Sequence, residues 1–122
     1  MAKIERFEDL ECWKESRILV KQIFTVCRDN KMDNDFDTKG QLRRAALSIM
    51  NNIAEGFGRF SNKQFIQFLG YSEGSATETK SMFYVLNDME YVERKKIKEM
   101  HNQVDKTRKL TLGLLKYLRT RE

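Results

Sequence analysis

Proline is absent from this chain of 122 residues, and cysteine and histidine are scarce. Because proline is favoured in the many turns of β-sandwiches and barrels, its absence argues against an all-β fold. No run of apolar residues approaches the ~20 residues of a membrane-spanning helix. The N-terminus carries Lys3, Glu5 and Arg6 where a signal peptide would have its apolar core. We therefore expect a cytoplasmic protein without a membrane partner.

The side chains needed for a catalytic or metal site are also missing. Cys12 and Cys27 are too few for a disulfide framework and match no zinc motif, so we expect reduced thiols. His101, the single histidine, follows Lys98 at the spacing where di-metal carboxylate bundles have glutamate. The acidic run over residues 33–37 lacks the glycine and the final glutamate of a calcium loop. We predict no catalytic residues, no metal site and no cofactor.

Apolar residues recur at three- and four-residue steps in four segments, which predicts four helices. We expect the first helix to begin at the N-cap Asp9 and end near residues 28–30, and the second to follow Thr38 as N-cap. Ser61 opens a capping box for the third helix, and the fourth follows a connection at residues 87–91. Such short connections favour an all-α fold, an antiparallel up-down-up-down four-helix bundle, as a single domain over residues 1–122.

Each predicted helix carries an apolar stripe that should face the core. Glycines Gly56 and Gly58 are expected to end the second helix, since glycine readily takes the left-handed cap conformation. Small residues in the third helix, including Gly70 and Gly74, predict close approach of a neighbouring backbone. The four stripes are, in chain order, Leu10, Trp13, Val20, Phe24 and Cys27; Leu42, Ala45, Ala46, Ile49, Met50, Ile53 and Phe57; Phe65, Leu69, Ser72, Ala76, Thr79, Phe83 and Leu86; and Ile97, Met100, Val104, Thr107, Thr111, Leu114 and Leu118.

Positive charge is concentrated in the last helix. The net charge is +5, and residues 91–122 hold ten basic and four acidic side chains. A row of lysines binds nucleic-acid phosphates regardless of base sequence, by releasing counterions. The row lacks interleaved aromatic residues, so contact with the backbone of RNA or DNA is predicted rather than base stacking, and a solvated outer face is the alternative. Five lysines share the sector opposite the apolar stripe: Lys95, Lys98, Lys106, Lys109 and Lys116.

A polar stripe lies opposite the apolar face of the second helix. Asparagine is a mediocre helix former, so its presence in mid-helix favours a hydrogen-bonding role within or between subunits. We also expect Arg43 to pair with Glu78 of the third helix. A solvated face is the alternative for both. The stripe comprises Arg44, Ser48, Asn51, Asn52 and Glu55.

Three segments resemble a known bacterial family. They are residues 7–14 (FEDLECWK), residues 41–59 (QLRRAALSIMNNIAEGFGR), and residues 61–69 with 74–78 (GSATE). Together they resemble the four helix bundle protein family, also called the 23S rRNA intervening-sequence proteins. Met50 stands where relatives commonly have proline, so we expect a straighter second helix here.

The resemblance implies an antiparallel four-helix bundle that assembles into a homopentameric ring or barrel and has no enzymatic activity. A related branch, the accessory proteins of diversity-generating retroelements, implies a reverse transcriptase as well as nucleic acid among the candidate partners. The family motif falls on eight residues that we expect to act in structure or at a subunit interface: Trp13, Arg43, Arg44, Ser48, Asn52, Glu55, Gly56 and Glu78.

We therefore predict a non-catalytic homo-oligomer, expected to be a pentamer, that binds the backbone of RNA or DNA and is linked to ribosomal RNA intervening sequences. A pentamer would repeat the lysine row five times, and repeated weak contacts bind with avidity. The alternative is a protein–protein interaction scaffold that binds no nucleic acid. A nuclease is disfavoured because the sequence shows no carboxylate cluster for metal ions.

Overall fold

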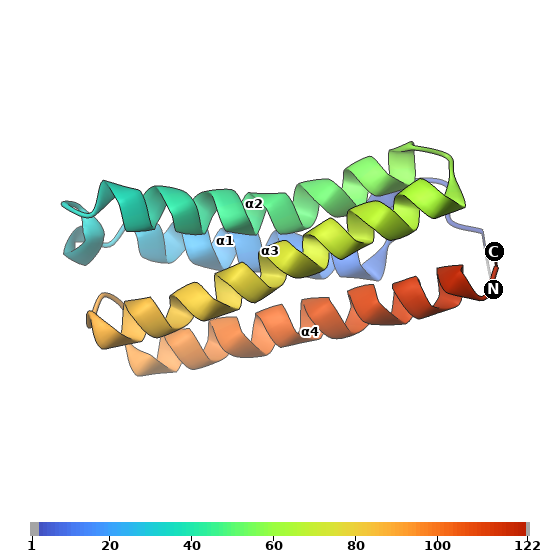
Figure 1. The fold of residues 1–122 in the computed structure, drawn as a ribbon. Helices are drawn as coiled ribbons and strands as arrows, with labels where there is room; N and C mark the ends of the chain where they lie inside the picture. Colours follow the sequence, from blue (N-terminus) through green and yellow to red (C-terminus); the bar gives the residue numbers. More distant parts are fainter. Residues whose placement is uncertain (1–2, 122) are drawn as a thin grey trace.

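Four long helices make up the computed structural model, which describes residues 3–121; residues 1, 2 and 122 of the predicted domain lie outside the described part. They are α1 (Glu11–Cys27), α2 (Phe36–Gly58), α3 (Asn62–Asp88) and α4 (Arg94–Arg119), with short 3₁₀ helices at Phe7–Asp9 and Asn30–Met32. Successive helices run in opposite directions, and both chain ends lie at the same end of the bundle (Figure 1). Helices α1 and α3 each pack against both α2 and α4. The predicted all-α up-down-up-down bundle is confirmed.

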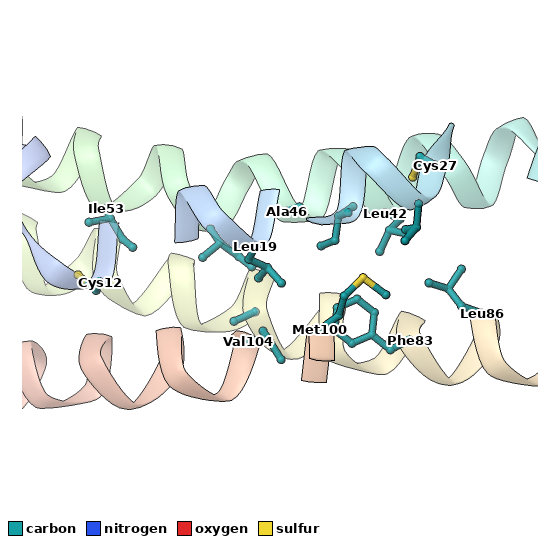
Figure 2. Packing of buried hydrophobic residues seen from close by; sticks show 14 of the residues in the cluster. Cys12, Leu19, Cys27, Leu42, Ala46, Ile53, Phe83, Leu86, Met100 and Val104 are labelled. Atoms are coloured by element: carbon teal, nitrogen blue, oxygen red, sulfur yellow. The ribbon is translucent and has the colours of Figure 1, made fainter. Parts of the chain in front are cut away.

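The core lies along the bundle axis and receives side chains from all four helices. Leu19, Met100, Val104 and Phe83 meet in its central part (Figure 2). All four are at most 1% exposed. Burying one such side chain contributes about 1.5–3 kcal/mol, so this shared core is the main term that holds the helices together.

Both cysteines are buried in this core as free thiols. Burial disfavours the charged thiolate and raises the pKa of Cys12 to about 11. Burial also raises the pKa of Cys27, although the positive charges of Arg43 and Lys39 oppose the shift. The expectation of free thiols is met, and both side chains act as small apolar groups.

The helix starts differ from the sequence prediction at two of the four helices. Asp9 does not cap α1: it lies in the preceding 3₁₀ helix, and the N-cap position belongs to Leu10, which is buried. Helix α2 begins earlier than predicted, because Asp35 is its N-cap and accepts a hydrogen bond from the Thr38 backbone N–H (3.1 Å). At α3 the predicted cap is confirmed, since Ser61 Oγ accepts from the Gln64 N–H.

The predicted apolar stripes are largely correct for α2, α3 and α4, whereas for the first helix only Leu10 and Cys27 of the five predicted residues are buried. In α4 the buried residue is Leu115 rather than Leu114, which is partly buried. In α1 the predicted Trp13, Val20 and Phe24 lie at the edge of the core and are only partly buried. Besides Cys27, the buried face of α1 consists of residues that were not predicted, namely Cys12, Ser16, Leu19, Ile23 and Val26.

The turn between α2 and α3 does not use glycine in the way the sequence predicts. Both Gly56 and Gly58 lie within α2, and no glycine of the described chain has a positive φ. The left-handed residue is Phe60, with φ of 59°. Helix α2 therefore extends to Gly58, and Phe60 reverses the chain.

Gly56 has a packing role instead. A Cβ built on Gly56 would lie 2.7 Å from the Cβ of Phe68 and 3.1 Å from Cδ1 of Phe65, so only glycine lets α3 approach this closely. The close approach predicted at Gly70 and Gly74 is not found, because a Cβ at either position would meet no atom within 4 Å. Both glycines are exposed on the outer face of α3.

Candidate nucleic-acid interface

The five predicted lysines all lie exposed on the outer face of α4. They are exposed because the opposite face of the helix is buried against α1 and α3. With a rise of 1.5 Å per residue, the row from Lys95 to Lys116 extends along about 32 Å of helix axis. Within residues 3–121, four of the five lysines form no ion pair: Lys95, Lys98, Lys109 and Lys116.

Lys106 differs from the other four lysines because it is tied to α1. Its Nζ lies 3.3 Å from Oε1 of Glu15. Gln103 Nε2 donates to the same carboxylate oxygen (2.9 Å), and these contacts lower the pKa of Glu15. The charge of Lys106 is thus balanced within the chain, and the freely available part of the row consists of the other four lysines.

Two acidic side chains of α4 lie near the row: Glu99 is exposed and forms no ion pair within residues 3–121, whereas Asp105 is paired. Asp105 Oδ1 accepts from Nζ of Lys80 on α3 at 2.7 Å. Arg108 Nε lies 3.2 Å from Glu73 Oε2, a second bridge between α4 and α3 with both side chains largely shielded from solvent. Sequence reasoning missed these bridges because they depend on the register between two helices distant in sequence. They neutralise the flank of α4 facing α3 and leave the outer row positive.

The family-motif residues Ser48 and Asn52 belong to a polar cluster between α2 and α3. Asn52 Nδ2 donates to the carbonyl oxygen (2.8 Å) and the Oγ (2.9 Å) of Ser48, whose Oγ also accepts from Ser75 Oγ (2.7 Å). Nearby, Ser72 Oγ donates to the Ile49 carbonyl (2.9 Å). The hydrogen-bonding role expected for the asparagines is thus found for Asn52 inside the chain. A buried polar group left without a partner costs about 1–3 kcal/mol, so this cluster helps to set the register of α2 on α3.

The expected ion pair between Arg43 and Glu78 is not formed. Oε2 of Glu78 accepts a hydrogen bond from Gln41 Nε2 (3.1 Å) instead. Arg43 is half-buried, and its charge acts on the Cys27 thiol. The pairing prediction is wrong because the rotation of α2 brings Gln41 rather than Arg43 over Glu78.

The remaining motif residues also have contacts within the chain. Trp13 packs edge-on against Phe7 with ring centroids 5.1 Å apart, which holds the N-terminal segment on α1. Arg44 is exposed, and its guanidinium Nη1 would lie 3.0 Å from a Cβ built on Gly40. Glu55 lies 3.6 Å from Nη2 of Arg59 on the helix surface. Trp13 thus has a structural role within the chain, whereas the side chains of Arg44 and Glu55 remain exposed to solvent.

His101 lies half-buried between α4 and α3, away from any catalytic constellation. Its ring meets Phe83 and Tyr84 edge-on, with centroids 5.1 Å and 5.2 Å apart. Burial lowers the pKa of His101, the charge of Lys80 lowers it further, and Asp105 opposes the shift. His101 is therefore a packing residue that is neutral at physiological pH.

This shift predicts a loss of stability in mildly acidic solution. Above the ordinary histidine pKa of 6.5, His101 is neutral in both the folded and the unfolded chain. Its protonation therefore does not lower the free energy of unfolding in that pH range. As the pH falls below 6.5, the unfolded chain takes up a proton first, and the free energy of unfolding decreases until the pH passes the folded-state pKa. Urea unfolding across this range measures the loss. His101→Gln should flatten this part of the profile, and equal slopes in both proteins would contradict the assignment.

Among residues 3–121, no three histidine, cysteine or acidic side chains are grouped so that they could hold a metal ion. None of the helices in the same part of the chain is both long enough and apolar enough to cross a membrane.

A family model described as 23S rRNA-intervening sequence protein matches residues 8–113. The chain belongs to this family. The family resemblance found in the three sequence segments is thereby confirmed, and it covers all four helices of the bundle except the last part of α4. No match is found among curated proteins.

A solved structure similar to this family member is described as a protein with unknown function from the S23 ribosomal protein family of Bacteroides thetaiotaomicron VPI-5482. The two chains are 23% identical, the TM-score is 0.79, and the match covers 86% of this chain and 95% of the other. At 23% identity, the similarity between the two structures supports the four-helix bundle fold of this chain but says nothing about its function. The function has to be inferred from the surface residues of the bundle.

Proposed function

We propose that this chain is a non-catalytic, homo-oligomeric, cytoplasmic protein that binds the phosphate backbone of RNA or DNA through the outer face of α4. The observation that carries the proposal is the row formed by Lys95, Lys98, Lys109 and Lys116, which have no ion-pair partner within residues 3–121. A lysine that is not already neutralised can replace the counterions condensed on a phosphate.

The outer face of α3 supports the homo-oligomeric part of the proposal. It combines Gly70 and Gly74, open to solvent, with the exposed side chains of Tyr71 and Val85. Small residues let a second backbone approach, and exposed apolar groups gain by burial. A pentamer, as the family resemblance implies, would bring five lysine rows into one assembly and raise affinity by avidity. Light scattering of the purified chain should give about five times the subunit mass of 14.5 kDa, and a monomer would contradict this part.

The second candidate is a protein-interaction scaffold that does not bind nucleic acid. The exposed Tyr71, Tyr84 and Val85 of α3 favour it, because exposed aromatic and apolar groups are common in protein interfaces. A reverse transcriptase is a candidate partner under either proposal. The scaffold predicts retrieval of a specific protein and no salt-dependent binding of polyanions.

Reversing two charges of the lysine row should weaken nucleic-acid binding and its salt dependence together. In a double variant with Lys98→Glu and Lys109→Glu, we expect at least about tenfold weaker binding of duplex DNA at low salt. The slope of log affinity against log salt should become shallower by about 0.9 for each lysine that contacts a phosphate. Fluorescence anisotropy over a salt series measures both quantities. Lys106 is kept, because its removal would leave Glu15 without its cation.

The matched control is the double variant Lys21→Glu and Lys31→Glu, which makes the same change in net charge at two exposed positions outside α4. It should retain most of the affinity and the slope. Equal losses in the two double variants would show that net charge, rather than the α4 row, governs binding.

A further inference from the structure

Phe60 places a large aromatic side chain at the position where the turn between α2 and α3 uses a left-handed backbone conformation. Its φ of 59° is left-handed, a conformation that costs a bulky residue about 1–2 kcal/mol relative to glycine. Its side chain is 95% exposed, so packing offsets almost none of this cost. An exposed aromatic ring held in a strained turn is a feature that points to a role outside the folded chain.

The surroundings of Phe60 form a recess at this end of the bundle. An open cavity of about 420 Å³ is lined by Phe60 together with Phe57, Phe65 and Ile4. Phe57 and Phe65 meet edge-on with centroids 5.9 Å apart, so the aromatic wall is rigid. Lys3 and Asn62 lie on the rim of the same cavity. The recess thus combines aromatic and apolar side chains with polar and cationic groups.

Lys3 lines the recess, and the C-terminal end of α4, where the lysine row ends, lies next to it. Nδ2 of Asn62 donates to the carbonyl oxygen of Leu118 (3.0 Å), which fixes the end of α4 against the start of α3. Both chain ends and the α2–α3 turn lie together there (Figure 1). Among the described acidic side chains at this end, Glu5 lines the cavity, Glu55 pairs with Arg59, Glu8 and Asp9 pair with Arg6, and Glu11 pairs with Lys14. Five cations near this end of the bundle form no ion pair within residues 3–121: Lys3, Lys63, Lys116, Arg119 and Arg121.

We propose that Phe60 is a stacking platform for an unpaired base of single-stranded nucleic acid, whose phosphates run onto the lysine row of α4. The inference rests on the proposed backbone binding and adds the substrate class. Every base has a π-face that stacks on an aromatic ring, whereas a duplex keeps these faces covered. The site therefore selects single strands or splayed-out nucleotides over uninterrupted duplex.

Phe36 supplies an internal comparison for this assignment. It is also strongly exposed, at 76%, at the start of α2 and at the opposite end of the bundle. Its immediate neighbours are the acidic residues Asp35 and Asp37. Carboxylates repel phosphates, so an exposed ring at this position has no electrostatic support for binding a strand.

The experiment compares Phe60→Ala with the matched control Phe36→Ala, using labelled oligoadenylate, an abasic strand of equal length, and a DNA duplex. Base stacking on an aromatic ring accounts for roughly 5- to 150-fold in affinity, so Phe60→Ala should weaken oligoadenylate binding by this factor. Binding of the abasic strand and the duplex should not change, and Phe36→Ala should behave as wild type with all three probes. Ribose and deoxyribose versions of oligoadenylate show whether the sugar adds to recognition.

A second variant separates this role from a structural one. Phe60→Gly relieves the left-handed strain, so its melting temperature should equal or exceed that of wild type while oligoadenylate binding falls as in Phe60→Ala. A lower melting temperature would assign Phe60 to packing and overturn the proposal.

The outcomes also separate this inference from the proposed function. Salt-dependent binding of all probes that is unaffected by Phe60→Ala would overturn the stacking platform and leave the lysine row intact. The same holds if Phe60→Ala weakens abasic and adenylate strands equally. Absence of binding to every probe by wild type would overturn both.

Discussion

Replacing Gly56 with alanine should lower the free energy of unfolding by about 1–2 kcal/mol, although alanine is the better helix former. The added Cβ would lie 2.7 Å from the Cβ of Phe68, closer than carbon atoms approach in folded proteins. Both atoms are fixed to helix backbones, so relief requires α3 to move away from α2. Overpacking of this kind typically costs about 1–3 kcal/mol or more, which exceeds the ~1 kcal/mol gained in helix propensity.

The matched control for Gly56→Ala is Gly113→Ala. Gly113 lies in the interior of α4, and a Cβ there would meet no atom within 4 Å. The propensity gain then acts alone and should raise the free energy of unfolding by about 1 kcal/mol. Urea unfolding of the two variants should therefore give changes of opposite sign. A stabilised Gly56→Ala variant would show that α2 and α3 are not held at the distance described.

Truncating Phe83 to alanine should cost about 3–5 kcal/mol, the largest effect expected from a single substitution in this chain. Phe83 is fully buried and reaches from α3 into the central core beside Met100 (Figure 2). Removal of the ring leaves a cavity that the rigid bundle fills only in part. Chemical unfolding measures the loss, and Phe36→Ala should change stability by less than about 0.5 kcal/mol, because the Phe36 ring is mostly in solvent.

The same substitution has a second, local readout at His101. Phe83 contacts the imidazole edge-on and contributes to the burial that lowers the pKa of His101. In Phe83→Ala this pKa should rise toward 6.5, as followed by NMR titration of the single histidine. An unchanged pKa would mean that Tyr84 and α4 alone exclude water from the ring.

The number, order and approximate length of the helices could be predicted from apolar periodicity, because most buried residues of α2, α3 and α4 are large and apolar. Helix α1 shows where this signal fails. The N-terminal half of its buried face contains Cys12 and Ser16, which do not look like core residues in a sequence. Ser16 is tolerated because its Oγ donates to the carbonyl of Trp13 at 2.7 Å, while Trp13 itself lies at the edge of the core.

The α2–α3 turn was mispredicted because the local preference and the observed conformation disagree. Glycine is the usual left-handed residue at a helix end, and Gly56 and Gly58 are near the turn. Packing against α3 requires Gly56 inside the helix, so the reversal falls on Phe60. A departure of this kind from local preference is expected at strained or functional positions.

For the candidate interface, the sequence predicted that the five lysines of α4 are exposed, but it could not predict which of them form ion pairs with carboxylates of other helices. The periodicity of α4 places its five lysines opposite the core, as observed. Whether each lysine meets a carboxylate depends on how far neighbouring helices are shifted along the axis. This is why the contact of Lys106 with Glu15, and that of Gln41 with Glu78, appear only in the folded bundle.

The burial of both thiols makes this chain suitable for cysteine chemistry as a tool. Cys12 and Cys27 are 2% and 3% exposed, and their raised pKa values keep them in the unreactive thiol form. A single cysteine introduced on the surface would therefore be alkylated selectively, with no need to remove the native pair. In the unaltered chain, the rate at which the two native thiols react would report how often the helices separate.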